Sequence, residues 1–231
     1  MKLSLANNLV TQNRLHGAAF SLTDISGLQA WYKFDTNITL NGSNVSEWGD
    51  SSGNGNDLTQ TTASDQPAYN SGDIDFDGSS DYMALDSALD LTSFTIFAVI
   101  DLDDTTLETL FGNGTDGTDF FRLNGSAWTI RTEGSSFQNN IGTTAGTNKY
   151  LLTLYTDVGA TSTTYYLEAD GTAENNASID NKTFTVGDVG RNSANAQFFN
   201  GKISEVAIFN AALSTADRET VEQDIMTRNG L

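Results

Sequence analysis

The feature that most constrains the fold is a run of nine residues, FTIFAVIDL, at Phe94–Leu102. Successive side chains of a β-strand point to opposite faces of the sheet. In this run both alternating sets are apolar: Phe94, Ile96, Ala98 and Ile100 on one side, Phe97 and Val99 on the other. A strand that is apolar on both faces has to be covered on both faces. We therefore expect 94–102 to form a central strand of a two-layer β structure.

The segment before this run is acidic and alternates regularly. In DIDFD, at 73–77, the carboxylates of three aspartates alternate with Ile74 and Phe76. A Gly-Ser-Ser turn at 78–80 follows, and the chain resumes at Tyr82. This pattern predicts an acidic hairpin at the rim of the β structure.

The remaining chain shows short strand patterns separated by polar turns, and one helical pattern. Further strands are predicted at 28–34, 107–111, 120–123, 128–132, 150–156, 163–169, 184–186 and 203–209. Near the end, Ser214 is a suitable N-cap, Ala216, Val221 and Ile225 share one helical face, and Gly230 follows the last turn. We expect an all-β, antiparallel two-sheet jelly-roll sandwich with an N-terminal arm at 1–25 and a short C-terminal helix at 214–229.

Charge and composition exclude several kinds of function. The formal net charge of −19 repels nucleic acid and anionic lipid, so neither is expected as a partner. It favours a well-solvated surface or, alternatively, divalent-cation binding. The chain has no cysteine, and its one histidine, His16, lies in the arm. Thiolate chemistry is therefore excluded, and a catalytic histidine is not expected. We find neither an export signal nor a membrane-spanning segment in the sequence.

Several motifs in order carry a resemblance to a known family. They are LQAWYKF, VSEWGDSSGNGNDLTQ, IDFDGSSDYM, FTIFAVI, YYLEADG and FNGKISEVAIFNAALSTADRETVEQDI. Together they resemble the laminin-G-like, or concanavalin A-like lectin/glucanase, jelly roll over 26–231. An arm followed by such a module is similar to structural proteins of tailed phages, marine ones especially. The resemblance implies two antiparallel sheets packed face to face, with ligands on the concave face or at the loop rim.

Two acidic loops are candidate calcium sites. Asp73–Gly78 and, loosely, Asp50–Gly55 match the first half of an EF-hand loop, but both lack the closing glutamate and flanking helices, so an EF-hand is rejected. Calcium held by rim loops is common among similar domains. The candidate ligands are Asp50, Asn54 and Asp57, with Asp77 and Asp81 as neighbours. The alternative is that these side chains only face solvent.

Carbohydrate chemistry is the other candidate. Glucanases of this fold carry a glutamate-x-aspartate-x-x-glutamate cluster, and no such run occurs here, so no catalytic residue is assigned and the chain is not expected to be an enzyme. Aromatic side chains can still provide stacking platforms for sugars. Most of them are expected in the core. Trp128 and Tyr166 are predicted to be the freest to face a ligand.

These observations lead to one functional hypothesis and two alternatives. The hypothesis is a non-catalytic phage protein at the virion surface, such as a head decoration, fibre or tail-associated protein, displaying a module that binds carbohydrate or mediates adhesion. Its partners would be other virion proteins, contacted through the arm, cell-surface glycans, and further copies of itself. The alternatives are a glycan hydrolase or lyase on the same fold, and a free bacterial lectin module.

Overall fold

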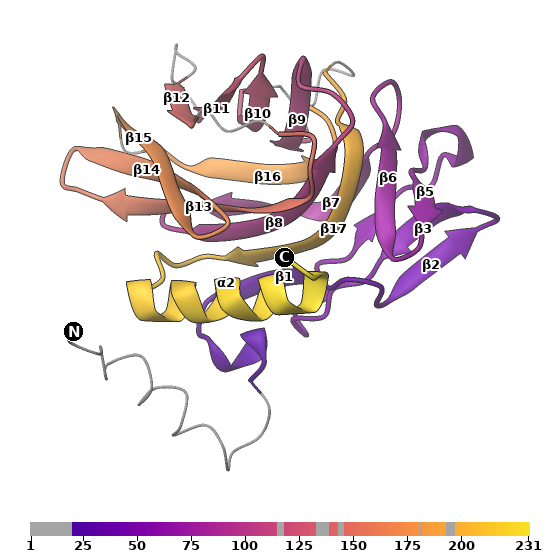
Figure 1. Ribbon diagram of the computed structural model, residues 1–231, viewed down its shortest axis with the longest axis horizontal. Coiled ribbons are helices and arrows are strands. Elements are labelled where there is room, and N and C mark those ends of the chain that lie inside the picture. The colour runs from indigo at the N-terminus through magenta and orange to yellow at the C-terminus, as the bar shows by residue number, and fades with distance from the viewer. Residues whose placement is uncertain (1–19, 115–117, 133–138, 143–145, 181, 193–196) are drawn as a thin grey trace, which may run out of the picture.

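The computed structural model describes residues 20–114, 118–132, 139–142, 146–180, 182–192 and 197–231. Within these residues the chain forms antiparallel strands stacked in two layers, with one α-helix near the C-terminus (Figure 1). The predicted fold class, an antiparallel jelly-roll sandwich with a C-terminal helix, is confirmed. No helix in the described part of the chain combines the length and the apolar character needed to cross a membrane.

The first sheet contains the strands that lie next to the helix. In spatial order its strands are β15 (Thr172–Asp180), β14 (Ser162–Ala169), β13 (Tyr150–Val158), β8 (Thr95–Leu102) and β17 (Asn200–Phe209). The far edge of β17 is shared by β1 (Leu28–Tyr32) and β6 (Asp73–Asp77). The two ends of one long strand thus pair with two different parts of the N-terminal half.

The second sheet lies on the other side of the core. Its strands, in spatial order, are β12 (Asn139–Gly142), β11 (Ala127–Arg131), β10 (Phe120–Asn124), β9 (Leu107–Gly112), β16 (Phe184–Val189), β7 (Met83–Leu91), β4 (Leu58–Thr59), β3 (Asn44–Trp48) and β2 (Ile38–Asn41). A short strand, β5 (Ala68–Asn70), pairs with both β3 and β6. The two layers are therefore joined at one edge by hydrogen bonds.

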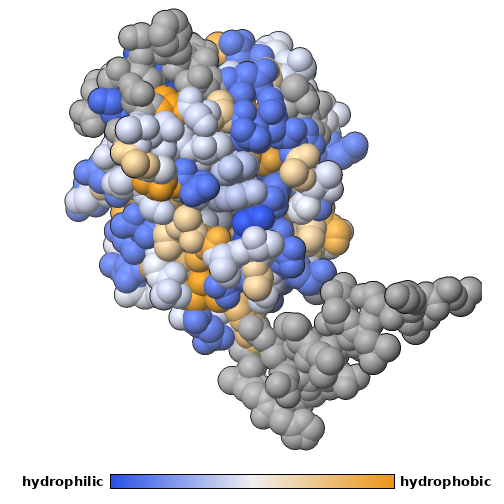
Figure 2. All heavy atoms as spheres, turned by 90° about the vertical axis from the view of Figure 1, so that its left-hand side faces the viewer, coloured by the Kyte–Doolittle hydropathy of each residue, from blue (hydrophilic) through white to orange (hydrophobic). Residues whose placement is uncertain are grey.

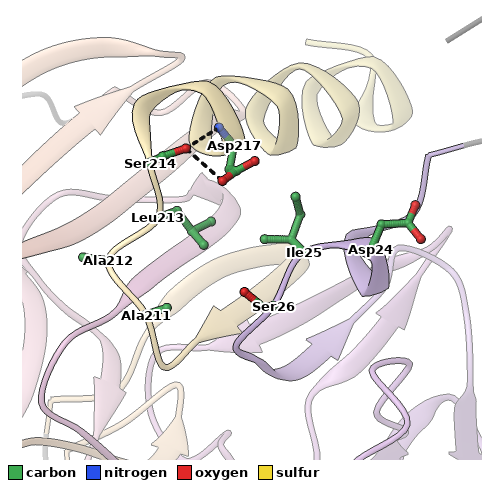
Figure 3. Close-up of a pocket in the computed structure, with 8 residues that line it drawn as sticks. All are labelled: Asp24, Ile25, Ser26, Ala211, Ala212, Leu213, Ser214 and Asp217. Atoms are coloured by element: carbon green, nitrogen blue, oxygen red, sulfur yellow. Dashed lines mark hydrogen bonds between the residues drawn. The ribbon is translucent and has the colours of Figure 1, made fainter. Parts of the chain in front are cut away.

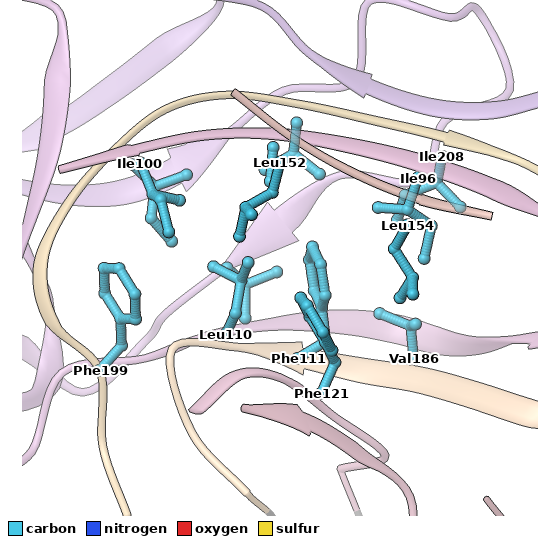
Figure 4. Packing of buried hydrophobic residues seen from close by; sticks show 14 of the residues in the cluster. Ile96, Ile100, Leu110, Phe111, Phe121, Leu152, Leu154, Val186, Phe199 and Ile208 are labelled. Atoms are coloured by element: carbon cyan, nitrogen blue, oxygen red, sulfur yellow. The ribbon is translucent and has the colours of Figure 1, made fainter. Parts of the chain in front are cut away.

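The main core fills the space between the two sheets. Figure 4 shows Ile96, Ile100, Leu152, Leu154 and Ile208 of the first sheet facing Leu110, Phe111, Phe121, Val186 and Phe199 from the opposite side. The other face of β8 carries Phe97 and Val99, which belong to a second core beneath the helix. Since β8 pairs with β13 on one side and β17 on the other, the prediction of a central strand covered on both faces is confirmed.

The helix α2 (Thr215–Asn229) covers the outer face of the first sheet. The Ser214 side chain accepts a hydrogen bond from the Asp217 backbone N–H, and Gly230 ends the helix with φ 73°, in the left-handed region that favours glycine. The buried face of α2 contains Val221 and Ile225 together with two charged residues, Arg218 and Glu222. Ala216, which was also expected on that face, is exposed.

The predicted acidic hairpin is wrong. Strand β6 pairs with β5 and β17, whereas β7 pairs with β4 and β16, so these consecutive strands lie in different sheets. The turn between them is held by Asp77, whose Oδ1 accepts backbone N–H groups of Ser79, Ser80 and Asp81 at 2.8–3.1 Å. The chain therefore crosses from one layer to the other, and alternation within each strand does not reveal its partner.

The described part of the predicted arm packs on the domain. A 3₁₀ turn, η1 (Leu22–Asp24), places Leu22 in the second core, where Phe20 and Ile25 also pack. Residues 1–19, including His16, lie outside the described residues. The prediction that 1–25 docks onto a partner therefore stays a prediction for the segment before Phe20.

Replacement of Phe97 by alanine should destabilise the fold strongly. Phe97 is fully buried and packs edge to face on Phe209 at 5.9 Å between ring centroids. Emptying this space should lower the free energy of unfolding by about 3–5 kcal/mol, measured by urea denaturation. The matched control, Leu40→Ala, changes a side chain that is 46% exposed and should cost less than about 0.5 kcal/mol. Equal losses in both variants would contradict the assignment of the second core.

Candidate functional site

A groove with a volume of about 360 Å³ lies where α2 begins, beside the ends of β13 and β14. Its lining residues are Tyr155, Thr156, Asp157, Tyr166, Ala212, Leu213, Ser214, Thr215 and Arg218. Figure 2 faces this end of the molecule and shows a mainly hydrophilic surface with small apolar patches. The groove combines aromatic rings, hydroxyls and a carboxylate in one shallow surface depression.

Two stacked tyrosines form the sheet side of the groove. Tyr155 on β13 lies directly opposite Tyr166 on β14, and their rings stack with centroids 5.0 Å apart and planes 11° apart. The guanidinium carbon of Arg218 lies 4.0 Å from the centroid of Tyr155. Tyr166 has no second ring or cation against it among the described residues, and it is half-buried. Tyr166 is therefore the outer member of the stack.

The stack is held in place by a buried ion pair beneath it. Glu168 Oε1 accepts hydrogen bonds from the Tyr155 hydroxyl at 2.9 Å and from Arg218 Nη2 at 3.1 Å. Glu168 and Arg218 are each 8% exposed, so this pairing is shielded from water. Burial and the hydrogen bond to Glu168 raise the pKa of Tyr155 to about 12. The Tyr155 ring is thus a neutral, fixed support for Tyr166.

A second buried carboxyl group lies next to this pair. Glu222 is one turn beyond Arg218 on α2 and is 4% exposed. Burial, together with the nearby carboxylate of Glu168, raises its pKa to about 7. Both carboxyl groups lie beneath the helix and do not line the groove. They are therefore part of the attachment of the helix and do not form an opposed acid and base across a substrate cleft.

Polar side chains lie near Tyr166 on the neighbouring strands. Asn176 on β15 is directly opposite Tyr166 and is exposed. The Thr164 and Ser178 hydroxyls form a cross-strand hydrogen bond of 2.9 Å on the same face of the sheet. Asp157 is exposed at the end of β13. An aromatic ring with hydroxyl, amide and carboxylate groups near it is suited to binding a sugar.

The prediction that Trp128 faces a ligand is wrong. Trp128 is fully buried in the main core and stacks on Phe121 with centroids 4.8 Å apart and planes 19° apart. On β11 the inward face contains Trp128 and Ile130, and Thr129 lies on the other face. Alternation separates these two faces in the sequence, but it does not say which of them is turned inward.

The first predicted calcium loop is occupied by internal hydrogen bonds. Asp50 Oδ1 accepts the backbone N–H groups of Trp31 at 2.8 Å and Ser52 at 2.7 Å, while its Oδ2 accepts that of Asn56 at 3.2 Å. Asp57 Oδ1 accepts the Asp50 N–H at 2.7 Å. Burial raises the pKa of Asp50, but these hydrogen bonds outweigh burial and lower it below its ordinary value. Both carboxylates thus hold the loop onto β1.

The other predicted calcium ligands also have structural partners. Asn54 donates its side-chain amide to the Leu28 carbonyl at 2.9 Å, Asp77 caps the turn at 79–81, and Asp81 Oδ2 accepts the Asp77 N–H at 3.0 Å. Burial and the Asp77 charge raise the pKa of Asp81 to about 7. Across the described residues, no group of three His, Cys, Asp or Glu side chains is arranged to hold a metal ion. Calcium binding by these side chains therefore stays a prediction.

A second groove of about 320 Å³ lies on the other side of the segment that leads into α2. Residues 24–26 form one side and 211–214 the other, with Asp217 at the helix start (Figure 3). Ile25 and Leu213 lie on facing segments there, and both pack against the second core. Asp24 and Ser26 also line this groove, which lies at the junction between the N-terminal segment and the domain.

Comparisons with known proteins agree with the observed fold. A family model described as the concanavalin A-like lectin/glucanases superfamily matches residues 77–217, more than half of the chain. None of the curated proteins matches the sequence. Among solved structures, domain 4 of AbnA, a GH43 extracellular arabinanase from Geobacillus stearothermophilus in complex with arabinotriose, is similar at 17% identity and a TM-score of 0.58. The match covers 85% of this chain and 98% of that domain.

Other similar structures are larger than this chain. Trypanosoma rangeli sialidase in complex with 2,3-difluorosialic acid matches with a TM-score of 0.61 and 15% identity, covering 91% of this chain and 35% of the sialidase. An arabinofuranosidase complexed with arabinofuranosyl-alpha-1,2-xylobiose matches with a TM-score of 0.57 and 12% identity, covering 88% and 60% of the two chains. The chain thus spans about a third of the sialidase. At these identities the likeness is one of fold.

The buried Glu222 should make stability depend on pH. Its pKa in the folded protein, about 7, is above the ordinary value of 4.5, so folding is favoured while this group is protonated. Its contribution is complete below pH 4.5 and is lost as the pH rises through about 7. The free energy of unfolding should therefore fall over this range, as measured by urea denaturation at several pH values.

The variant Glu222→Gln keeps the size of the side chain but cannot titrate, so its free energy of unfolding should depend less on pH. Some pH dependence should remain in this variant, because burial also raises the pKa values of Asp81 and Glu108 to about 7. The control Glu219→Gln, at an exposed position on the same helix, should follow the unaltered protein. Parallel curves for Glu222→Gln and the unaltered protein would contradict the prediction.

Proposed function

This chain belongs to the concanavalin A-like lectin/glucanase superfamily, and we propose that it is a non-catalytic module that binds carbohydrate in the groove beside Tyr166. The observation that carries the proposal is the stack of Arg218, Tyr155 and Tyr166, which ends at Tyr166, a half-buried ring that lines the groove. Such a ring offers an apolar surface to the C–H groups of a sugar, and the polar groups around it offer hydrogen bonds to the hydroxyls.

The support beneath the stack favours binding because it fixes the ring in advance. Tyr155 is held by Glu168, and Glu168 is held by Arg218 from the first turn of α2. Tyr166 lies on β14, between β13 and β15, and its side chain is half-buried. It therefore has little rotational freedom to lose when a ligand binds. A preorganised ring face contributes more to affinity than a mobile side chain does.

The arrangement of the acidic groups supports the proposal of binding without catalysis. Glycoside hydrolysis by the usual route needs two carboxyl groups on opposite sides of the scissile bond. Among the described residues that line the groove, Asp157 alone carries a carboxylate. Incubation with polysaccharides should therefore release no reducing ends.

Alanine at Tyr166 should weaken glycan binding. A glycan array that includes arabino-oligosaccharides would identify a ligand, and isothermal titration would then compare variants. Tyr166→Ala removes the stacking face and should lower the affinity about tenfold. Tyr166→Phe keeps the ring and should retain most of the affinity. Equal affinity of Tyr166→Ala and the unaltered protein would exclude this groove as the binding site.

We also propose that the module is displayed on a phage particle and that residues before Phe20 dock it there. The described residues of the second core begin at Phe20 and are all kept when 1–19 are deleted, so we expect the domain to fold with an unchanged melting temperature. The shortened chain should be absent from purified particles. Incorporation at the normal level would contradict the role of this segment.

A further inference from the structure

Glu222 is a buried carboxyl group with no counter-charge of its own. It lies on the buried face of α2, is 4% exposed, and its Oε1 is buried with no hydrogen-bond partner among the described residues. Arg218, one turn earlier on the same helix, donates its Nε and Nη2 to the two oxygens of Glu168 at 3.4 Å and 3.1 Å. Two buried carboxyl groups therefore share one guanidinium. Ionising both is costly, because one carboxylate would be left buried without a partner.

Arg218 is the one cation available to Glu222 within the described part of the chain. Arg228, in the last turn of α2, is already bound by two carboxylates at 2.7 Å, and the strands β1 and β8 bring apolar side chains to this interface. The remaining titratable groups that face it from the neighbouring elements are Tyr155 on β13, Glu168 on β14, Asp170 in the turn after β14, and Glu205 on β17. Apart from Tyr155, these are all carboxyl groups. An ionised Glu222 can therefore gain a counter-charge only by taking Arg218 from Glu168.

The same guanidinium is part of the groove beside Tyr166. Arg218 lines the groove and lies 4.0 Å from the centroid of Tyr155, on which Tyr166 stacks. Residues four positions apart lie on the same side of a helix, so Arg218 can reach Glu222 by a change of side-chain rotamer. Such a change would remove the cation from the Tyr155 ring and from Glu168, which holds the Tyr155 hydroxyl. The stack would then lose the support beneath it.

The pH range of this exchange follows from the surroundings of Glu222. Burial, and then the charge of Glu168, raise its pKa, whereas Thr153 and Arg218 lower it, and the result is about 7. The ordinary value is 4.5, so the arrangement that buries Glu222 is favoured while this group is protonated. Its advantage is complete below pH 4.5 and is lost as the pH rises through about 7.

We propose that Glu222 is a pH switch for the groove: when it ionises, Arg218 moves from Glu168 and Tyr155 to Glu222, and the stack that carries Tyr166 loosens. The groove is then intact in acidic surroundings and weakened in alkaline ones. The switch involves only side chains of this chain, whereas its effect on ligand affinity rests on the function proposed above.

NMR of the ligand-free protein tests the switch itself. The carboxyl resonance of Glu222 should titrate with a midpoint near pH 7, and the Nε–H resonance of Arg218 should move with the same midpoint. In Glu222→Gln the Arg218 resonance should stay in place over this range. In Glu219→Gln, changed at an exposed position, it should move as in the unaltered protein. The Nε–H resonance of Arg228 is the internal control and should not follow this midpoint. An Arg218 resonance that does not move when Glu222 ionises, or that moves equally in Glu222→Gln, would overturn the proposal.

Isothermal titration with arabinotriose tests the effect on the groove. The affinity should be about threefold or more lower at about pH 8.5 than at about pH 5.5, and this difference should disappear in Glu222→Gln. Equal affinities of the unaltered protein at the two pH values would overturn the proposal, because the groove would then not respond to Glu222. Absence of arabinotriose binding at both pH values would count against the function proposed for the groove, and the NMR titration would still decide the switch.

Discussion

Burial of β8 on both faces is the constraint from which the rest of the structure follows. One face of β8 needs the second sheet, and Ile96, Ala98 and Ile100 meet it in the main core. The other face needs a cover of its own, which α2 supplies together with the segment around Leu22. Since an apolar side chain contributes about 1.5–3 kcal/mol when it is fully buried, neither face is left open to water. The second sheet and the helix thus each bury one apolar face of β8.

One buried and one partly buried ion pair then set the position of the helix along the sheet. Arg218 in the first turn pairs with Glu168 on β14, and Arg228 in the last turn pairs with Glu205 on β17 at 2.7 Å. Apolar contacts allow a helix to slide, whereas directional hydrogen bonds between charged groups fix a register. The same fixing brings Arg218 over Tyr155. The proposed sugar groove is thus a consequence of how the helix is attached, and its shape depends on contacts beneath the surface.

Local patterns in the sequence were sufficient for single elements but not for their partners. The helix from Ser214 to Gly230, the two-faced strand at 94–102 and the one-domain sandwich were all predicted, because caps, periodicity and apolar content are local properties. The acidic hairpin failed, since β6 and β7 alternate equally well in either sheet. Strand β15 was missed because its sequence, TAENNASID, is polar, and it needs only one pairing neighbour, β14.

The sequence by itself determined the fold class, the family and the presence of aromatic rings and carboxylates suited to binding sugars. Only the tertiary structure decided which of these side chains lie at the surface, where they can contact a ligand. Trp128 and Tyr166 have the same kind of alternating neighbours, but Trp128 lies between two sheets and Tyr166 on an outer face. The physical reason is that alternation fixes which residues share a face, and only the packing of one layer on another decides which face meets water.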